Sequence, residues 1–178
     1  MSVLKGHAHK YGANVNTDVL IPARYLNSSD RSFWLQHALE DLDPEFRTRV
    51  RPGDIIVATT NFGCGSSREQ APIVIKDSGV SAVIASSFAR IFFRNAINIG
   101  LPLLESPEAA EDVQMRDEIE VDPSSGEIVN LTQGKTYQAT PYPAFMQSLV
   151  TRGGILPYAR QRLAELKARK ADRTESKR

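Results

Sequence analysis

Apolar residues follow two different spacings along the first hundred residues of the chain. Short continuous apolar runs, typical of strands buried on both faces of a sheet, lie at 54–58, 80–85 and 101–104. Apolar residues at helical spacing lie at 32–42, in the run that ends near 77, and at 86–98, where Ile91 and Phe92 are expected to face inward. A weak alternation over 3–11 predicts one more strand. Strands that alternate with helices in this way predict an α/β fold.

The last third of the chain shifts to shorter β elements. Its pattern predicts strands at 119–122, 127–131 and 135–140 and helices at 143–152 and 158–171. Pro123-Ser124-Ser125-Gly126 predicts the turn of a hairpin between the first two of these strands. The expected architecture is therefore α/β, with a mixed sheet flanked by helices and functional loops at the strand ends.

Composition narrows the class of protein. The chain has 178 residues, 41% of them hydrophobic and 24% charged, which fits one globular domain without a membrane span. Its single cysteine, Cys64, excludes an internal disulfide, a zinc finger and a self-contained iron–sulfur cluster. The first residues lack the apolar core of a secretion signal, so a cytoplasmic location is expected.

Charge is unevenly distributed along the chain. Residues 160–178 hold eight Lys/Arg and three Asp/Glu, whereas the rest of the chain holds 14 and 18. We therefore expect a domain over 1–158 and a basic C-terminal helix or tail over 159–178, solvated rather than bound to nucleic acid.

The densest chemical signal is the loop from Gly63 to Glu69, which follows a predicted buried strand and precedes a helix. Gly63 and Gly65 allow backbone conformations closed to other residues and a close approach to a ligand. Ser66, Ser67 and Arg68 add two hydroxyls and a guanidinium near free helix amides, a combination that suits an anion.

Two alternatives to this anion pocket stay open. Ser66-Ser67-Arg68-Glu69 also fits a capping box, which would only start a helix. Pro72 would clash inside a helix capped at Ser66, so either the helix kinks or it begins near Pro72 after an irregular turn.

Cys64 is a candidate nucleophile, although a packed small side chain is the better interpretation. The loop lacks the endings of a P-loop and of a dinucleotide fingerprint.

Three segments in order resemble the small subunits of 3-isopropylmalate dehydratase, which form the mobile swivel domain of the aconitase superfamily. The segments are Asn16-Thr17-Asp18-Val19-Leu20-Ile21-Pro22-Ala23-Arg24-Tyr25-Leu26, Asn61-Phe62-Gly63-Cys64-Gly65-Ser66-Ser67-Arg68-Glu69, and 87–102, which begins Ser87-Phe88-Ala89-Arg90-Ile91-Phe92-Phe93-Arg94. The resemblance extends to about Tyr158 and implies a swivelling β/β/α domain. Within the third segment, Arg90 and Arg94 are expected to form surface or interface ion pairs.

The resemblance implies half of an enzyme. In that family a large subunit carries a [4Fe–4S] cluster on three cysteines, and the pair isomerises 2-isopropylmalate and 3-isopropylmalate by dehydration and rehydration in leucine biosynthesis. The resemblance gives Ser66 the role of base, Arg68 and Ser67 contacts to substrate, and Asp18 a place in the active site. An Asx turn or helix cap is an equally good reading of Asp18. This chain is expected to bind no metal itself.

The resemblance also bears on specificity. In the homoaconitase branch an arginine commonly follows the Tyr25-Leu26 pair, whereas Asn27 and Ser28 stand here, which favours a neutral substituent such as isopropyl. Arg24 is close enough to replace the missing guanidinium. Other hydroxy-diacid dehydratases, of the homoaconitase, dimethylmalate or citramalate type, stay open, as does a stand-alone anion-binding module.

Overall fold

The centre of the fold is one seven-stranded mixed sheet. The computed structural model describes residues 3–175, and side chains over 3–168. The strands are β1 (Leu4–Lys10), β2 (Ile55–Ala58), β3 (Ala82–Ala85), β4 (Leu103–Glu105), β5 (Glu118–Asp122), β6 (Glu127–Asn130) and β7 (Lys135–Gln138). Their order across the sheet is β4-β3-β2-β1-β5-β6-β7. The first four strands in this order are parallel, and β5, β6 and β7 continue the sheet antiparallel from β1. The predicted mixed sheet is confirmed.

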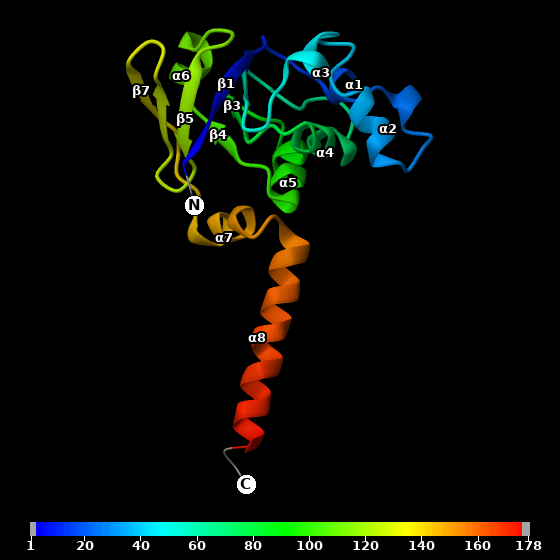
Figure 1. The fold of residues 1–178 in the computed structure, drawn as a ribbon, viewed down its shortest axis with the longest axis vertical. Helices are drawn as coiled ribbons and strands as arrows, with labels where there is room; N and C mark the ends of the chain where they lie inside the picture. Colours follow the sequence, from blue (N-terminus) through cyan, green and yellow to red (C-terminus); the bar gives the residue numbers. More distant parts are fainter. Residues whose placement is uncertain (1–2, 176–178) are drawn as a thin grey trace.

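Helices cover the sheet and extend beyond it (Figure 1). They are α1 (Thr17–Leu20), α2 (Arg31–Gln36), α3 (Phe46–Arg49), α4 (Gln70–Asp77), α5 (Arg90–Ile99), α6 (Pro107–Asp112), α7 (Ala144–Thr151) and α8 (Ile155–Glu175). The sequence pattern did not predict α1, α3 or α6, each of which has six residues or fewer. Short helices of this kind are held by tertiary contacts rather than by an amphipathic repeat.

The parallel strands are buried on both faces, which explains their uninterrupted apolar sequences. Ile56 of β2 and Val83 of β3 belong to a large cluster beneath α4 and α5. Ile55 and Ile84 face the opposite cluster, which also contains side chains of α6 and of the antiparallel strands. Since neighbouring residues of one strand enter different clusters, the two faces hold the sheet from both sides.

Two predicted helices are shorter than their apolar patterns. The helix expected over 32–42 ends at Gln36, and Leu39 beyond it has a left-handed φ of 59° and donates its N–H to the Leu20 carbonyl at 3.0 Å. The helix expected from 86 begins at Arg90, because Ser87–Ala89 is extended backbone paired with Phe62. The expectation that Ile91 faces inward is wrong, since it is 47% exposed, whereas Phe92 is 2% exposed.

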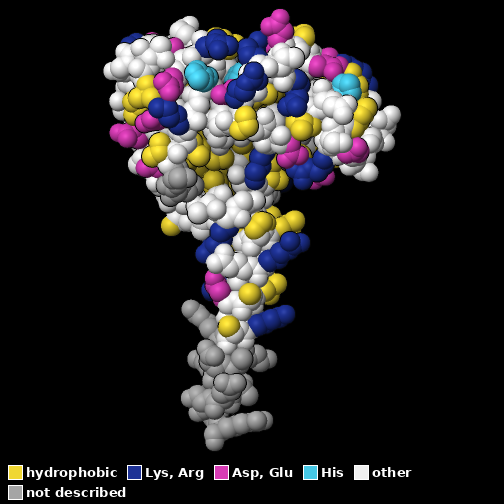
Figure 2. Space-filling model, in the orientation of Figure 1, with side chains coloured by type: hydrophobic (Ala, Val, Ile, Leu, Met, Phe, Trp, Pro, Cys, Tyr) yellow, Lys and Arg dark blue, Asp and Glu magenta, His cyan; other side chains and the backbone are white. Residues whose placement is uncertain are grey.

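The C-terminal helix α8 leaves the body at Gly153-Gly154 and projects away from it (Figure 1). Exposed leucines, Leu156, Leu163 and Leu166, alternate along it with Lys and Arg side chains (Figure 2). The expected boundary between 158 and 159 falls inside this helix, and residues 176–178 of the expected basic tail lie outside the described residues. A separate role for the tail stays a prediction. No helix within 3–175 combines the length and apolar character that a membrane span requires.

Candidate active site

Three segments that are far apart in the sequence meet beside the carboxyl end of β2. An isolated parallel bridge joins Asn16 to Cys64, and a second one joins Phe62 to Phe88. Backbone hydrogen bonds reinforce both contacts, from the Gly63 N–H to the Val15 carbonyl at 2.7 Å and from the Ala89 N–H to the Phe62 carbonyl at 2.9 Å. The loop 61–69 is therefore held between the two other segments that carry the family resemblance.

The central bend exposes two hydroxyls while its backbone is fixed. Gly63 and Gly65 have φ values of 77° and 90°, a left-handed conformation that favours glycine. The Ser66 carbonyl accepts hydrogen bonds from the Thr17 hydroxyl at 2.9 Å and from the Arg68 N–H at 2.8 Å. Ser66 and Ser67 are both exposed. Within residues 3–168 neither hydroxyl has a hydrogen-bond partner, so both are available to a ligand.

The bend does not cap the helix that follows it. Helix α4 begins at Gln70, and its N-cap residue Glu69 makes no side-chain capping bond. Pro72 sits in the first turn, where its missing N–H breaks no helical hydrogen bond. The capping-box interpretation of Ser66 is therefore wrong, and the irregular turn before a helix that begins near Pro72 is confirmed.

Arg68 forms a half-buried ion pair with Asp18. Its Nη2 lies 2.5 Å from Asp18 Oδ1, and its Nη1 donates to the Ile21 carbonyl at 2.9 Å. The side chain of Arg68 is 13% exposed, whereas that of Asp18 is 53% exposed. Asn16 caps α1 by accepting from the Val19 N–H at 3.0 Å, so the carboxylate of Asp18 is free to orient the guanidinium.

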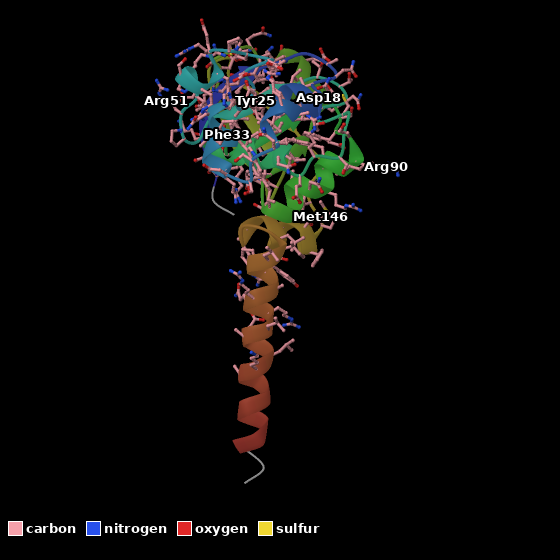
Figure 3. All side chains as sticks on the ribbon, turned by 90° about the vertical axis from the view of Figure 1, so that its right-hand side faces the viewer. Asp18, Tyr25, Phe33, Arg51, Arg90 and Met146 are labelled. Carbon is pink, nitrogen blue, oxygen red and sulfur yellow. The ribbon has the colours of Figure 1, made fainter. Side chains whose placement is uncertain are left out.

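A cavity of about 880 Å³ opens beside the bend. Its lining combines the bend with the start of α5: Gly63, Gly65, Ser66, Phe88, Ala89, Arg90, Ile91, Phe93, Arg94 and Glu105. Arg90 lies at the edge of the body with its side chain directed away from the fold (Figure 3). Neither Arg90 nor Arg94 forms an ion pair within 3–168, so the expected surface pairing is not found there and interface pairing stays a prediction. Their convergence with Ser66 depends on the Phe62–Phe88 bridge, which local sequence does not reveal.

The predicted specificity residues lie apart from this cavity. Asn27 is exposed, and the Ser28 carbonyl accepts from the Trp34 indole at 2.8 Å. Neither residue lines the cavity that contains Ser66, and Asp18, Ser67 and Arg68, which adjoin Ser66 in the bend, are not among its lining residues either. Arg24 pairs with Asp41 at 2.5 Å, so its guanidinium is already engaged and does not replace the missing arginine as a partner for a substrate carboxylate. The roles of Asn27 and Ser28 stay predictions.

The side chains of the described residues do not suit an iron–sulfur cluster. Over the described residues, no three His, Cys, Asp or Glu side chains gather as metal ligands. Cys64 is the one thiol of the chain, and it is only partly exposed. A multi-thiolate cluster would need cysteines from another polypeptide.

Comparison with known proteins places the chain among close relatives. Residues 13–109 match the model of the aconitase C-terminal domain. The chain is 55% identical over 161 residues to the 3-isopropylmalate dehydratase small subunit of Moorella thermoacetica, covering 90% of this chain and 97% of the relative. It is 58% identical over 154 residues to the subunit of that name from Clostridioides difficile, covering 86% and 94%. A crystal structure of 3-isopropylmalate dehydratase from Methanocaldococcus jannaschii matches with a TM-score of 0.90 and 40% identity, covering 94% of this chain and 99% of that one.

Proposed function

The chain belongs to the family of 3-isopropylmalate dehydratase small subunits, and we propose that it serves as one half of a hydro-lyase that interconverts 2-isopropylmalate and 3-isopropylmalate in leucine biosynthesis. The observation that supports this most directly is the assembly of all three resembling segments around one exposed serine bend.

Ser66 is the proposed base. Dehydration of a hydroxy acid removes a proton from a carbon next to a carboxylate and the hydroxyl group from the adjacent carbon. Ser66, ionised to its alkoxide, would accept that proton and become a neutral hydroxyl, while the substrate hydroxyl group would leave with a second proton as water. A serine hydroxyl is a weak base unless nearby positive charge stabilises its anion. Arg90 and Arg94 line the same cavity as Ser66, together with one carboxylate, Glu105, so two guanidiniums against one acid would favour the alkoxide.

Arg68 and Ser67 are the proposed substrate contacts. The guanidinium of Arg68 presents a planar fork that matches a carboxylate. Its hydrogen bond to the Ile21 carbonyl and its ion pair with Asp18 fix the orientation of that fork before substrate binds. Asp18 is therefore a positioning residue in this proposal. The exposed hydroxyl of Ser67 would donate to the same substrate carboxylate.

The second half of the enzyme is a large subunit that carries the iron–sulfur cluster. The cluster would supply a Lewis-acidic iron for the hydroxyl group of the substrate. This chain offers a single cysteine and, over the described residues, no group of metal ligands. Its own residues would hold the substrate carboxylate and move the proton at Ser66 Oγ. A cytoplasmic complex fits this role.

Asn27 and Ser28 are the proposed determinants of the substrate side group. Neither carries a positive charge, so these two positions offer no cationic partner for an additional substrate carboxylate. Since Arg24 is held by Asp41, it does not supply that partner. The loop would therefore favour an isopropyl group over a carboxylate chain.

Co-expression with a cognate large subunit tests the proposal. The purified complex should isomerise isopropylmalate with a higher kcat/KM than homoaconitate, dimethylmalate or citramalate, and each subunit alone should be inactive. Preference for a tricarboxylate would contradict the specificity proposal, and activity of the small subunit alone would contradict the division of labour.

A further inference from the structure

A second cavity lies at the opposite end of β2 from Ser66. Its volume is about 430 Å³, and it opens between β1, α3 and the turn before β5. Three arginines and two histidines are among its lining residues. The full lining is His7, Ala8, His9, Glu45, Thr48, Arg49, Arg51, Asp54 and Arg116. Histidine side chains adjoin Lys and Arg side chains on the upper part of the face in Figure 2, over the region of β1 and α3 in Figure 1. None of these residues belongs to the proposed active site.

Asp54 organises the floor of this cavity. Its buried carboxylate accepts hydrogen bonds from the His9 ring at 2.8 Å, from the Arg51 N–H at 2.8 Å and from the His7 N–H at 3.0 Å. Burial alone would raise the pKa of Asp54, but these hydrogen bonds lower it below its ordinary value. An ionised carboxylate can only accept, so His9 Nε2 must carry the proton that it donates.

Two buried nitrogens at the wall of the cavity lack partners. Arg49 Nε and His9 Nδ1 are both inaccessible to solvent and make no hydrogen bond to any described residue. The whole His9 side chain is 3% exposed, and its ring packs edge-on against Phe46 at a centroid distance of 5.3 Å. Arg49 Nε is always a donor, and an unpaired buried donor destabilises the folded chain. Because Arg49 is one of the lining residues, a ligand acceptor that displaced its neighbours and reached this nitrogen would satisfy it.

The rim adds positive charge that no carboxylate neutralises. Arg51 and Arg116 are exposed, and neither forms an ion pair within the described residues. The Arg51 guanidinium donates to the Thr48 carbonyl at 2.9 Å, and the Arg116 N–H donates to the Ala8 carbonyl at 2.8 Å, so both residues are anchored beside β1 and α3.

The two carboxylates of the lining are already engaged. Asp54 has its three donors, and Glu45 lies 3.4 Å from Arg49 Nη1. The second terminal nitrogen of Arg49 pairs with Asp43, outside the lining. Arg49 Nε is therefore the one unpaired donor of a guanidinium whose two terminal nitrogens are ion-paired within the described residues.

We propose that this cavity binds a phosphate group. Its oxygens would accept from Arg49 Nε, while Arg51 and Arg116 would neutralise the remaining charge. Arginine suits this ligand because its fork matches a phosphate. The cavity volume leaves room for an organic group attached to the phosphate. The proposal is independent of the dehydratase function.

Calorimetric titration of the full-length chain tests the site, with ionic strength held constant by sodium chloride. Inorganic phosphate should bind at one site with a Kd below about 1 mM. Adenosine monophosphate and phosphoserine, titrated separately, distinguish free phosphate from a phosphate ester as the preferred ligand. The variants Arg51→Gln and Arg116→Gln should each weaken binding at least about tenfold. Both positions are exposed, so these variants should fold.

The matched control is Arg47→Gln, on the short helix α3 that also carries Arg49 but outside the cavity lining, which should leave binding unchanged. In NMR spectra, the Nε–Hε resonance of Arg49 should shift on addition of phosphate. Three results would overturn the proposal. They are no saturable binding beyond that of chloride, binding by Arg51→Gln and Arg116→Gln as tight as by the parent chain, or loss of binding in Ser66→Ala. The last result would place the phosphate in the active-site cavity.

Discussion

Substitution of Gly63 by alanine measures how tightly the serine bend is packed against the third segment. A Cβ added at Gly63 would lie 2.1 Å from Phe92 Cγ and 2.4 Å from Phe92 Cβ. Phe92 is 2% exposed, so its ring cannot move aside into solvent. The left-handed φ of 77° adds about 1–2 kcal/mol for any L side chain, and overpacking of a filled core adds about 1–3 kcal/mol. We therefore expect Gly63→Ala to lower the free energy of unfolding by about 2–5 kcal/mol.

Two other glycines separate the contributions in urea unfolding of the full chain. At Gly65, φ is 90° but an added Cβ would lie 3.4 Å from its nearest neighbour, so Gly65→Ala should show only the backbone cost of about 1–2 kcal/mol. At Gly12 an added Cβ meets nothing within 4 Å, so Gly12→Ala should change stability by less than about 1 kcal/mol. If Gly63→Ala destabilised the chain no more than Gly65→Ala, the close contact between the bend and Phe92 would be refuted.

Other substitutions probe the site and the core separately. Arg68→Lys keeps the charge but loses the planar fork, so kcat/KM of the complex should fall about 10–100-fold, and unchanged kinetics would make Arg68 structural. Asn27→Arg should reduce kcat/KM for isopropylmalate and raise it for a substrate with an additional carboxylate, and an unchanged ratio in competition assays would place the specificity loop elsewhere. The folded pKa of Asp54 lies below its ordinary value, so its stabilising contribution is present at neutral pH and is lost as pH falls through the folded pKa. In urea unfolding, Asp54→Asn should therefore lose less stability on acidification than the parent chain. Equal losses would contradict the lowered pKa of Asp54. Tyr142→Phe removes the buried hydroxyl that accepts from the Leu103 N–H at 2.5 Å, so the free energy of unfolding should fall by about 1–3 kcal/mol, whereas an unchanged value would show that water replaces the hydroxyl.

Sequence pattern predicted the strands well because the sheet is encoded locally. The uninterrupted apolar runs of β2 and β3 reflect burial on both faces, and the turn after Asp122 reflects hairpin chemistry. The mixed sheet followed from these elements. The family resemblance added the assignment of Ser66 and Arg68, which spacing alone left open between an anion site and a helix cap.

Non-local contacts account for what the pattern missed. Ser87–Ala89 has a helical pattern but forms extended backbone because Phe62 pairs with Phe88. The same pairing places Arg90 in the cavity with Ser66, although 24 positions separate them in the sequence. The hydrogen bond between His9 and Asp54 likewise spans 45 positions, so no local sequence motif predicts the second cavity.

The central claim is that Ser66 moves the proton, and the turnover number of a Ser66→Ala complex tests it most directly. The bend is fixed by the Ser66 carbonyl rather than by its exposed hydroxyl, so the variant should fold and assemble with the large subunit as the parent does. Loss of a positioned base should lower kcat at least about 100-fold, while Ser67→Ala, the matched control in the same bend, should mainly raise KM. A Ser66→Ala complex of normal size whose kcat stays within about twofold of the parent value would contradict the assignment.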